Sequence, residues 1–156
     1  MAIILTVAGG YWVWNGFFSE AGKARRLVNE QVEFYEKAEK AYVEAMTADT
    51  YGGKTPQETL DLFVSALEKE DIDLASKYFL LDENLSREKW VVYLQGVKER
   101  NLLATMARDI KYKTEAGNLN SDNEFGYILR NNDGTVGIQI DLRLNKYSEV
   151  WKIERL

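Results

Sequence analysis

An uninterrupted apolar run opens the chain and has no counterpart in the rest of it. No charged residue lies between Ala2 and Phe18, whereas the sequence beyond Ser19 is rich in charge. Seventeen residues of α-helix would span about 25 Å, slightly less than a hydrocarbon core of about 30 Å. Aromatic residues near its end are typical of a lipid–water interface: Tyr11, Trp12, Trp14, Phe17 and Phe18. We therefore expect residues 1–18 to be a transmembrane anchor that attaches the chain to a membrane through residues 2–18.

Two other interpretations of this run stay open. A signal peptide could be cleaved at the small residues Ser19 and Ala21, although bulky aromatic side chains lie just before them. A helix buried in the core of the protein is the second alternative. No basic residue precedes the run, which suggests that Met1 is not the natural start and that a short basic stretch is missing. By the positive-inside rule, the basic residues at 23–26 would place the chain after the run on the cytoplasmic side of the membrane. Additional basic residues before the run would favour the opposite orientation.

Residues 19–53 are expected to form an amphipathic stalk helix followed by a linker. Apolar residues recur at helical spacing between Gly22 and Asp49, with Glu and Lys on the remaining positions. Such a helix could act as a stalk, and it could pair with a second copy to make a homodimer. The alternative is that its apolar stripe packs on the following domain, because Ala and Tyr make a poor coiled-coil seam. The turn residues 51–54 end the segment.

Residues 54–156 are expected to fold as one domain that begins with helices. Thr55 can cap a helix whose first position is Pro56, and Glu58 completes a capping box. The stripe that follows is typical of a helix covering a core: Leu60, Phe63, Val64 and Leu67. Two further short helices are expected, with Asp71 or Asp73 as the cap of one and Ser86 as the cap of the other.

The second half of this domain has the two-residue period of β-strands. Alternation starts near Ala107 and includes Ile110, Tyr112 and Thr114. A turn signal at residues 132–134 predicts a hairpin, and the clearest strand, residues 136–144, follows it. Residues 150–153 supply the last strand. The order predicts an α+β domain of about three helices packed on a curved antiparallel sheet of about four strands.

The local sequence of residues 54–156 resembles the nuclear-transport-factor-2-like, or cystatin-like, α+β superfamily. The resemblance depends on the helix start at residues 55–60, the acidic turn Glu70–Asp71 and the aromatic pair Tyr78 and Phe79. It implies a cone between helices and sheet that can hold a ligand. Bacterial members of unknown function are often membrane-anchored or secreted, so the resemblance implies a domain outside the cytoplasm. It does not imply one function, because this fold hosts isomerases, dehydratases and binding modules.

Composition excludes several classes of chemistry. The net charge is −5, and Lys and Arg do not cluster in the last hundred residues, so no nucleic-acid partner is expected. The chain has no cysteine and no histidine. A thiolate nucleophile, a lipid-modified cysteine, a Ser-His-Asp triad and a histidine-containing zinc site are therefore ruled out. No calcium-loop pattern is present, and no metal or cofactor is expected.

Four aromatic residues are the candidate ligand-binding side chains of the cone. An apolar wall with a few polar groups suits a small hydrophobic ligand, and the candidates are Tyr93, Tyr112, Tyr127 and Trp151. Ordinary core packing is the alternative for these rings. A protein partner is the other kind of ligand that the domain could bind.

Two functions remain for the domain. The first is a membrane-tethered, non-catalytic binding or interaction module. The alternative is a small pocket enzyme of the isomerase or dehydratase kind, which would use a carboxylate beside tyrosines. Asp109 and Asp141 are carboxylates of the required type. Alternation with Ile138 and Ile140 directs Asp141 toward solvent, and no catalytic residue is assigned.

Overall fold

The computed structural model describes residues 20–131 and 133–156. The chain divides into two compact units, the first ending at Val43 and the second comprising Glu44–Leu156. The expected anchor, residues 2–18, lies outside the described residues. Within the described part, no helix is long and apolar enough to span a membrane.

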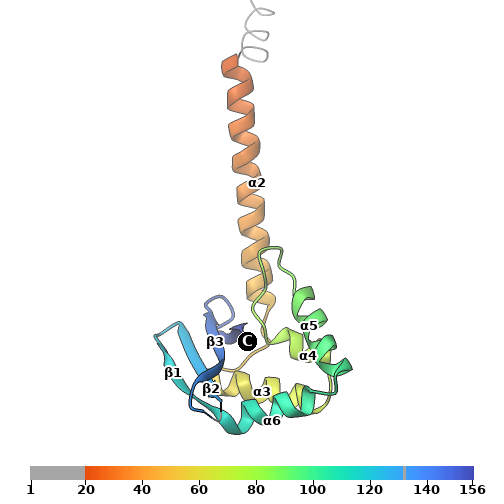
Figure 1. Ribbon diagram of the computed structural model, residues 1–156. Helices are drawn as coiled ribbons and strands as arrows, with labels where there is room; N and C mark the ends of the chain where they lie inside the picture. Colours follow the sequence, from red (N-terminus) through yellow and green to blue (C-terminus); the bar gives the residue numbers. More distant parts are fainter. Residues whose placement is uncertain (1–19, 132) are drawn as a thin grey trace, which may run out of the picture. The chain divides into compact units, whose positions relative to one another are not determined.

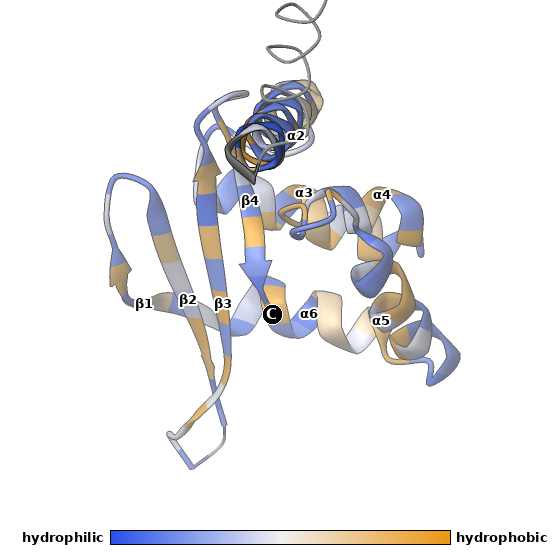
Figure 2. Ribbon diagram, turned by 90° about the horizontal axis from the view of Figure 1, so that it is seen from above, coloured by the Kyte–Doolittle hydropathy of each residue, from blue (hydrophilic) through white to orange (hydrophobic). Residues whose placement is uncertain are grey.

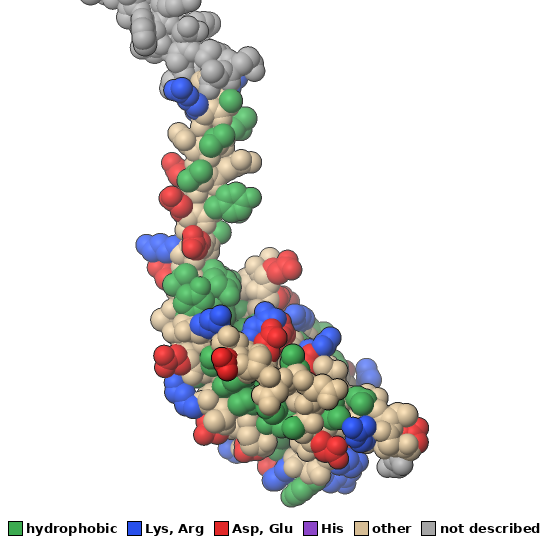
Figure 3. Space-filling model, turned by 90° about the vertical axis from the view of Figure 1, so that its left-hand side faces the viewer, with side chains coloured by type: hydrophobic (Ala, Val, Ile, Leu, Met, Phe, Trp, Pro, Cys, Tyr) green, Lys and Arg blue, Asp and Glu red, His purple; other side chains and the backbone are tan. Residues whose placement is uncertain are grey.

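The first unit contributes most of α2, the helix Glu20–Ala48. Its bounds agree closely with the long helix expected from the sequence. Several large apolar side chains along it are exposed, among them Leu27, Phe34 and Tyr35. Figure 3 shows hydrophobic side chains along this helix.

The second unit has an α+β fold, as the sequence predicts. Four helices precede a sheet of four strands (Figure 1). The helices are α3 (Pro56–Glu68), α4 (Ile72–Lys77), α5 (Glu88–Glu99) and α6 (Leu103–Lys113), and the strands are β1 (Thr114–Asn120), β2 (Glu124–Arg130), β3 (Val136–Asn145) and β4 (Val150–Arg155). Residues 44–53, which include the expected linker, belong to this same unit.

The start of α3 is fixed by the capping box that the sequence predicts. The Thr55 hydroxyl accepts a hydrogen bond from the Glu58 backbone N–H, and the Glu58 carboxylate accepts from the backbone N–H of Thr55. Together they satisfy two N–H groups that the helix itself leaves without acceptors. Asp71 caps α4 through the Leu74 N–H. Ser86 accepts from the Glu88 N–H, so α5 begins where expected within two residues.

The sheet is a simple antiparallel meander with strand order β1-β2-β3-β4. The hairpin expected at residues 132–134 joins β2 to β3, where Asn131 and Thr135 close the turn through backbone hydrogen bonding. Figure 2 shows helices α3–α6 gathered on one side of the four strands. Two sheet residues, Ile140 and Ile153, are fully buried among helical side chains such as Phe63.

The expectation that β structure begins near Ala107 is wrong. Residues Leu103–Lys113 form helix α6, and the first strand begins only at Thr114. The buried positions of α6 are Leu103, Ala107 and Ile110, whose spacing of four and three residues defines one helical face. Because α6 packs along α3, burial of this face decides the local structure over the weak alternation at residues 110–114.

Candidate functional site

A cavity of about 660 Å³ opens between α5, α6 and the sheet of the second unit. The elements that form it are labelled in Figure 2. Its volume lies within the range of about 300–1,000 Å³ common for small-molecule sites. The lining residues are Tyr93, Val97, Arg100, Leu102, Thr105, Met106, Asp109, Ile110, Leu129, Gly137, Ile138, Gln139, Arg155 and Leu156.

Two walls of this cavity are formed by α5 and α6, and helical spacing explains which of their residues line it. Tyr93 and Val97 are four residues apart, so they lie on one face of α5, and Arg100 is the residue that follows the end of this helix. Thr105 and Asp109 are similarly one turn apart on α6. Asn101, with a φ of 56°, adopts the left-handed conformation between the two helices. Asn tolerates this conformation better than most residues, and the sharp reversal brings both walls to one cavity.

Most of the cavity lining is apolar. Ile110 and Leu129 belong to the buried core and form its inner surface. Ile138 and Tyr93 are exposed by 48% and 45% respectively, so apolar surface of the cavity remains accessible to water. An apolar ligand that covered these side chains would gain hydrophobic free energy.

The charged groups of the cavity differ in how well they are paired. Asp109 lies 2.9 Å from the Lys113 ammonium. Arg155 donates from Nε to Asp141 Oδ2 at 2.8 Å and also ion-pairs with it through Nη2. The Arg100 guanidinium has neither an ion-pair nor a hydrogen-bond partner within residues 20–131 and 133–156. It is therefore the cavity's unneutralised cation.

The structure places one of the four aromatic candidates in this cavity. Tyr93 lines it, whereas Tyr112 is 73% exposed and lies outside it. Tyr127 is buried, and its hydroxyl donates to Gln57 Oε1 at 3.1 Å. Burial, followed by the nearby charge of Asp61, raises the pKa of Tyr127. Trp151 is also buried in the core, so these four rings do not form one wall.

Three cavity residues are not among those predicted from the sequence: Arg100, Thr105 and Arg155. A signal for Thr105 was available once residues 103–113 are taken as helical, because Leu103, Ala107 and Ile110 then define the buried face of α6 and set Thr105 apart from it. Arg100 follows the end of α5 and has no such signal. Arg155 carries no comparable signal. Its position depends on how β4 pairs with β3.

The expectation that Asp141 faces solvent is wrong, because its side chain is only 6% exposed. Gln139 Nε2 donates to Asp141 Oδ1 at 2.8 Å, and Arg155 binds the other oxygen. The pairing of β3 with β4 shifts register between Asp141 and Leu142, which sets Arg155 opposite Asp141. Gln139 and Arg155 thus bind the Asp141 carboxylate, and the positive charge of Arg155 neutralises it.

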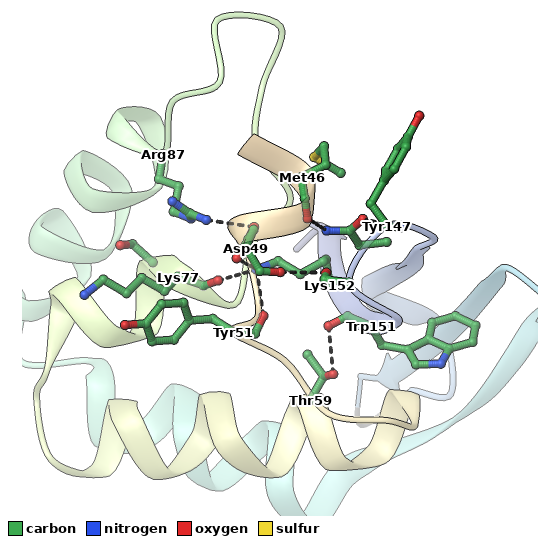
Figure 4. Close-up of polar contacts among 12 residues, drawn as sticks. Met46, Asp49, Tyr51, Thr59, Lys77, Arg87, Tyr147, Trp151 and Lys152 are labelled. Carbon is green, nitrogen blue, oxygen red and sulfur yellow. Dashed lines mark hydrogen bonds and ion pairs between the residues drawn. The ribbon is translucent and has the colours of Figure 1, made fainter. Parts of the chain in front are cut away.

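A second polar cluster, in the interior of the second unit, centres on Lys152 (Figure 4). The Lys152 side chain is fully buried. Its ammonium donates to Asp49 Oδ1 at 2.8 Å, to the Tyr51 carbonyl at 2.7 Å and to the Lys77 carbonyl. An ammonium has three N–H groups, so each of them has an acceptor.

Asp49 bridges two cations in this cluster. Its second oxygen, Oδ2, lies 2.7 Å from Arg87 Nη2. Burial lowers the pKa of Lys152 to about 8, and the hydrogen bond and negative charge of Asp49 oppose that effect. The cluster joins the end of α2, the segment after α4 and strand β4, all within the second unit. Because Lys152 is fully buried, its three hydrogen bonds hold these segments together.

No metal site is found in the part of the chain that the structure describes, where no three acidic side chains gather closely enough to hold an ion. No protein-family model, curated protein or solved structure matches this chain. The resemblance to the nuclear-transport-factor-2-like superfamily therefore stays a prediction.

Proposed function

We propose that this chain is a non-catalytic binding module, held at a membrane by residues 2–18, whose domain binds a small apolar ligand between α5, α6 and β3. The observation that supports this function best is the cavity of about 660 Å³. Its inner surface is apolar, and a few polar groups surround it, which is the usual composition of a small-molecule site. Tyr93 supplies an aromatic side chain to its wall.

The membrane part of the proposal depends on the sequence. The uncharged run from Ala2 to Phe18 and its aromatic end are typical of an anchor. Helices followed by an antiparallel meander agree with a nuclear-transport-factor-2-like cone, and we propose that fold relationship and a position outside the cytoplasm on the same basis. A binding domain on such an anchor would meet its ligand close to the membrane surface.

The catalytic alternative has less support. Tyr93 and Asp109 both line the cavity, which is the pairing that a carboxylate–tyrosine enzyme would need. However, Asp109 is ion-paired with Lys113, and the chain has no histidine to act with it. A general base must be available to take a proton, so we favour binding without chemistry.

Photo-cross-linking of the full chain in lipid nanodiscs tests this proposal. The probe is a long-chain alcohol with a diazirine in its alkyl chain, and the labelled residues are mapped by mass spectrometry. We expect labels in α5, α6 and β3 as well as in residues 2–18, which would report membrane insertion in the same sample. Labels confined to residues 2–18 would overturn the binding function, and an unlabelled anchor would overturn the membrane attachment.

Two tryptophan variants make the result specific to the cavity. Thr105→Trp places a large side chain in the lining of α6, and we expect it to abolish labelling of α5 and β3. The matched control is Ala104→Trp, because Ala104 is an exposed neighbour on the same helix and does not line the cavity. Equal labelling in both variants would show that the probe binds elsewhere.

A further inference from the structure

The cavity has a charge imbalance that is opposite to that of the chain as a whole. The protein carries a net charge of −5. The lining, in contrast, contains two arginines and one aspartate: Arg100, Arg155 and Asp109. An excess of positive charge at an apolar cavity of an acidic protein indicates which charge a ligand would carry.

Two of these three charges are compensated by ion pairs within the protein. Asp109 lies against Lys113, so its charge is compensated on the same helix. Arg155 neutralises the buried carboxylate of Asp141. Arg100 has no such partner among the described residues. One positive charge thus remains for a ligand.

Arg100 is placed where it can receive the charged end of a molecule whose body lies in the cavity. It directly follows the C-terminal end of α5, on which Tyr93 and Val97 lie one turn apart, and all three residues line the same cavity. Arg155 can assist, because its bonds to Asp141 use Nε and Nη2, and Nη1 has no hydrogen-bond acceptor among the described residues. A guanidinium has five N–H donors, and its planar geometry matches that of a carboxylate.

We infer that the ligand is a free amphipathic carboxylate, with its apolar body in the cavity and its carboxylate on Arg100. This inference rests on the proposed binding function and adds the chemical class of the ligand. Arg100 is exposed to water, so a neutral ligand would gain no ion pair from its guanidinium, and a cationic ligand would be repelled by it. A hydrogen bond between charged groups is also stronger than one between neutral groups.

The cross-linking experiment on the full chain distinguishes this inference from the proposed function. A diazirine-labelled fatty carboxylate is compared with the alcohol of equal chain length in zwitterionic nanodiscs. We expect the carboxylate to reach half-maximal labelling of α5 and α6 at a concentration about tenfold lower, which corresponds to about 1.4 kcal/mol. Arg100→Gln should weaken labelling by the carboxylate about tenfold more than labelling by the alcohol, which removes this advantage.

Arg108→Gln is the matched control for Arg100→Gln. Arg108 is an exposed arginine of α6 that does not line the cavity, so its replacement changes the net charge equally. The carboxylate should keep its advantage in this variant. An equal loss in both variants would attribute the effect to net charge and overturn the assignment of Arg100.

The remaining outcomes separate the two proposals and the two sources of an anion. If the alcohol and the carboxylate label the cavity equally, the binding function stands and the carboxylate assignment is wrong. If neither probe labels the cavity, both proposals fail. A third probe, phosphatidylglycerol with a diazirine in its acyl chain, tests a lipid headgroup as the anion. Labelling of α5 and α6 by this lipid as efficient as that by the carboxylate would overturn the free carboxylate.

Discussion

The Lys152 ammonium donates to Asp49 Oδ1 over 2.8 Å, although 103 positions of sequence separate the two residues. Both side chains are almost completely buried. The bond connects the residue just after α2 to the middle of β4. Asp49 therefore belongs to the interior of the second unit, which begins at Glu44, although the sequence predicts this residue only as the end of the long amphipathic helix.

Removal of the Asp49 carboxylate should strongly destabilise the protein. Asp49→Ala would leave the Lys152 ammonium buried without its anion and Arg87 without its partner. Breaking a buried ion pair in this way costs about 3–5 kcal/mol. Chemical denaturation monitored by circular dichroism measures the loss. Glu115→Ala, which removes an exposed pair with Arg130, is the control and should have a much smaller effect.

Lys152 should make the stability of the protein rise with pH above about 8. Its pKa is about 8 in the folded protein and about 10.4 when unfolded. Between these values the unfolded chain binds more protons, so the free energy of unfolding increases with pH. The contribution of Lys152 should grow by about 1–3 kcal/mol from pH 8 to pH 10.

The Lys152→Met variant checks this pH dependence by denaturation at a series of pH values. The wild-type curve should rise relative to that of the variant between pH 8 and pH 10. The pKa values of Tyr78 and Tyr127 are raised by burial. These two residues therefore lower the free energy of unfolding above pH 10, equally in the wild type and in the variant. Parallel curves below that pH would contradict the assignment.

Deletion of residues 1–18 should leave the second unit folded. The second unit has a core of its own, because the buried hydrophobic residues of the described part all lie at Met46 or later. The shortened protein should unfold cooperatively in thermal denaturation. A broad transition without cooperativity would favour the alternative in which residues 1–18 form a core helix.

Gly52 should not tolerate a side chain. Its φ is 153°, and a Cβ atom there would lie 2.3 Å from the Trp151 carbonyl oxygen. Gly52→Ala should therefore cost about 1–3 kcal/mol through backbone strain and displacement of β4. Gly96→Ala is the matched control, because Gly96 lies inside α5 with open space around it. That change should stabilise the protein by about 0.5–1 kcal/mol, and equal losses in thermal denaturation would contradict the argument.

The local features of the fold follow from neighbouring residues in the sequence. The capping box of Thr55 and Glu58 and the turn between β2 and β3 depend on interactions a few positions apart, and β3 is indicated by the alternation of its own side chains. The class of the domain, helices followed by an antiparallel sheet, follows from the order of these elements. Tyr93 could likewise be identified as a candidate cavity residue from its residue type and its element.

Only the tertiary structure decided the features that depend on distant partners. Helix α6 extends through Tyr112 because packing on α3 outweighs a weak strand pattern. Asp141 is buried because a register shift brings Arg155 to it, and no local pattern encodes that shift. The burial of Lys152 likewise requires Asp49. The sequence by itself determines the local hydrogen bonds and the alternation of side chains, whereas burial and the pairing of charges are properties of the assembled core.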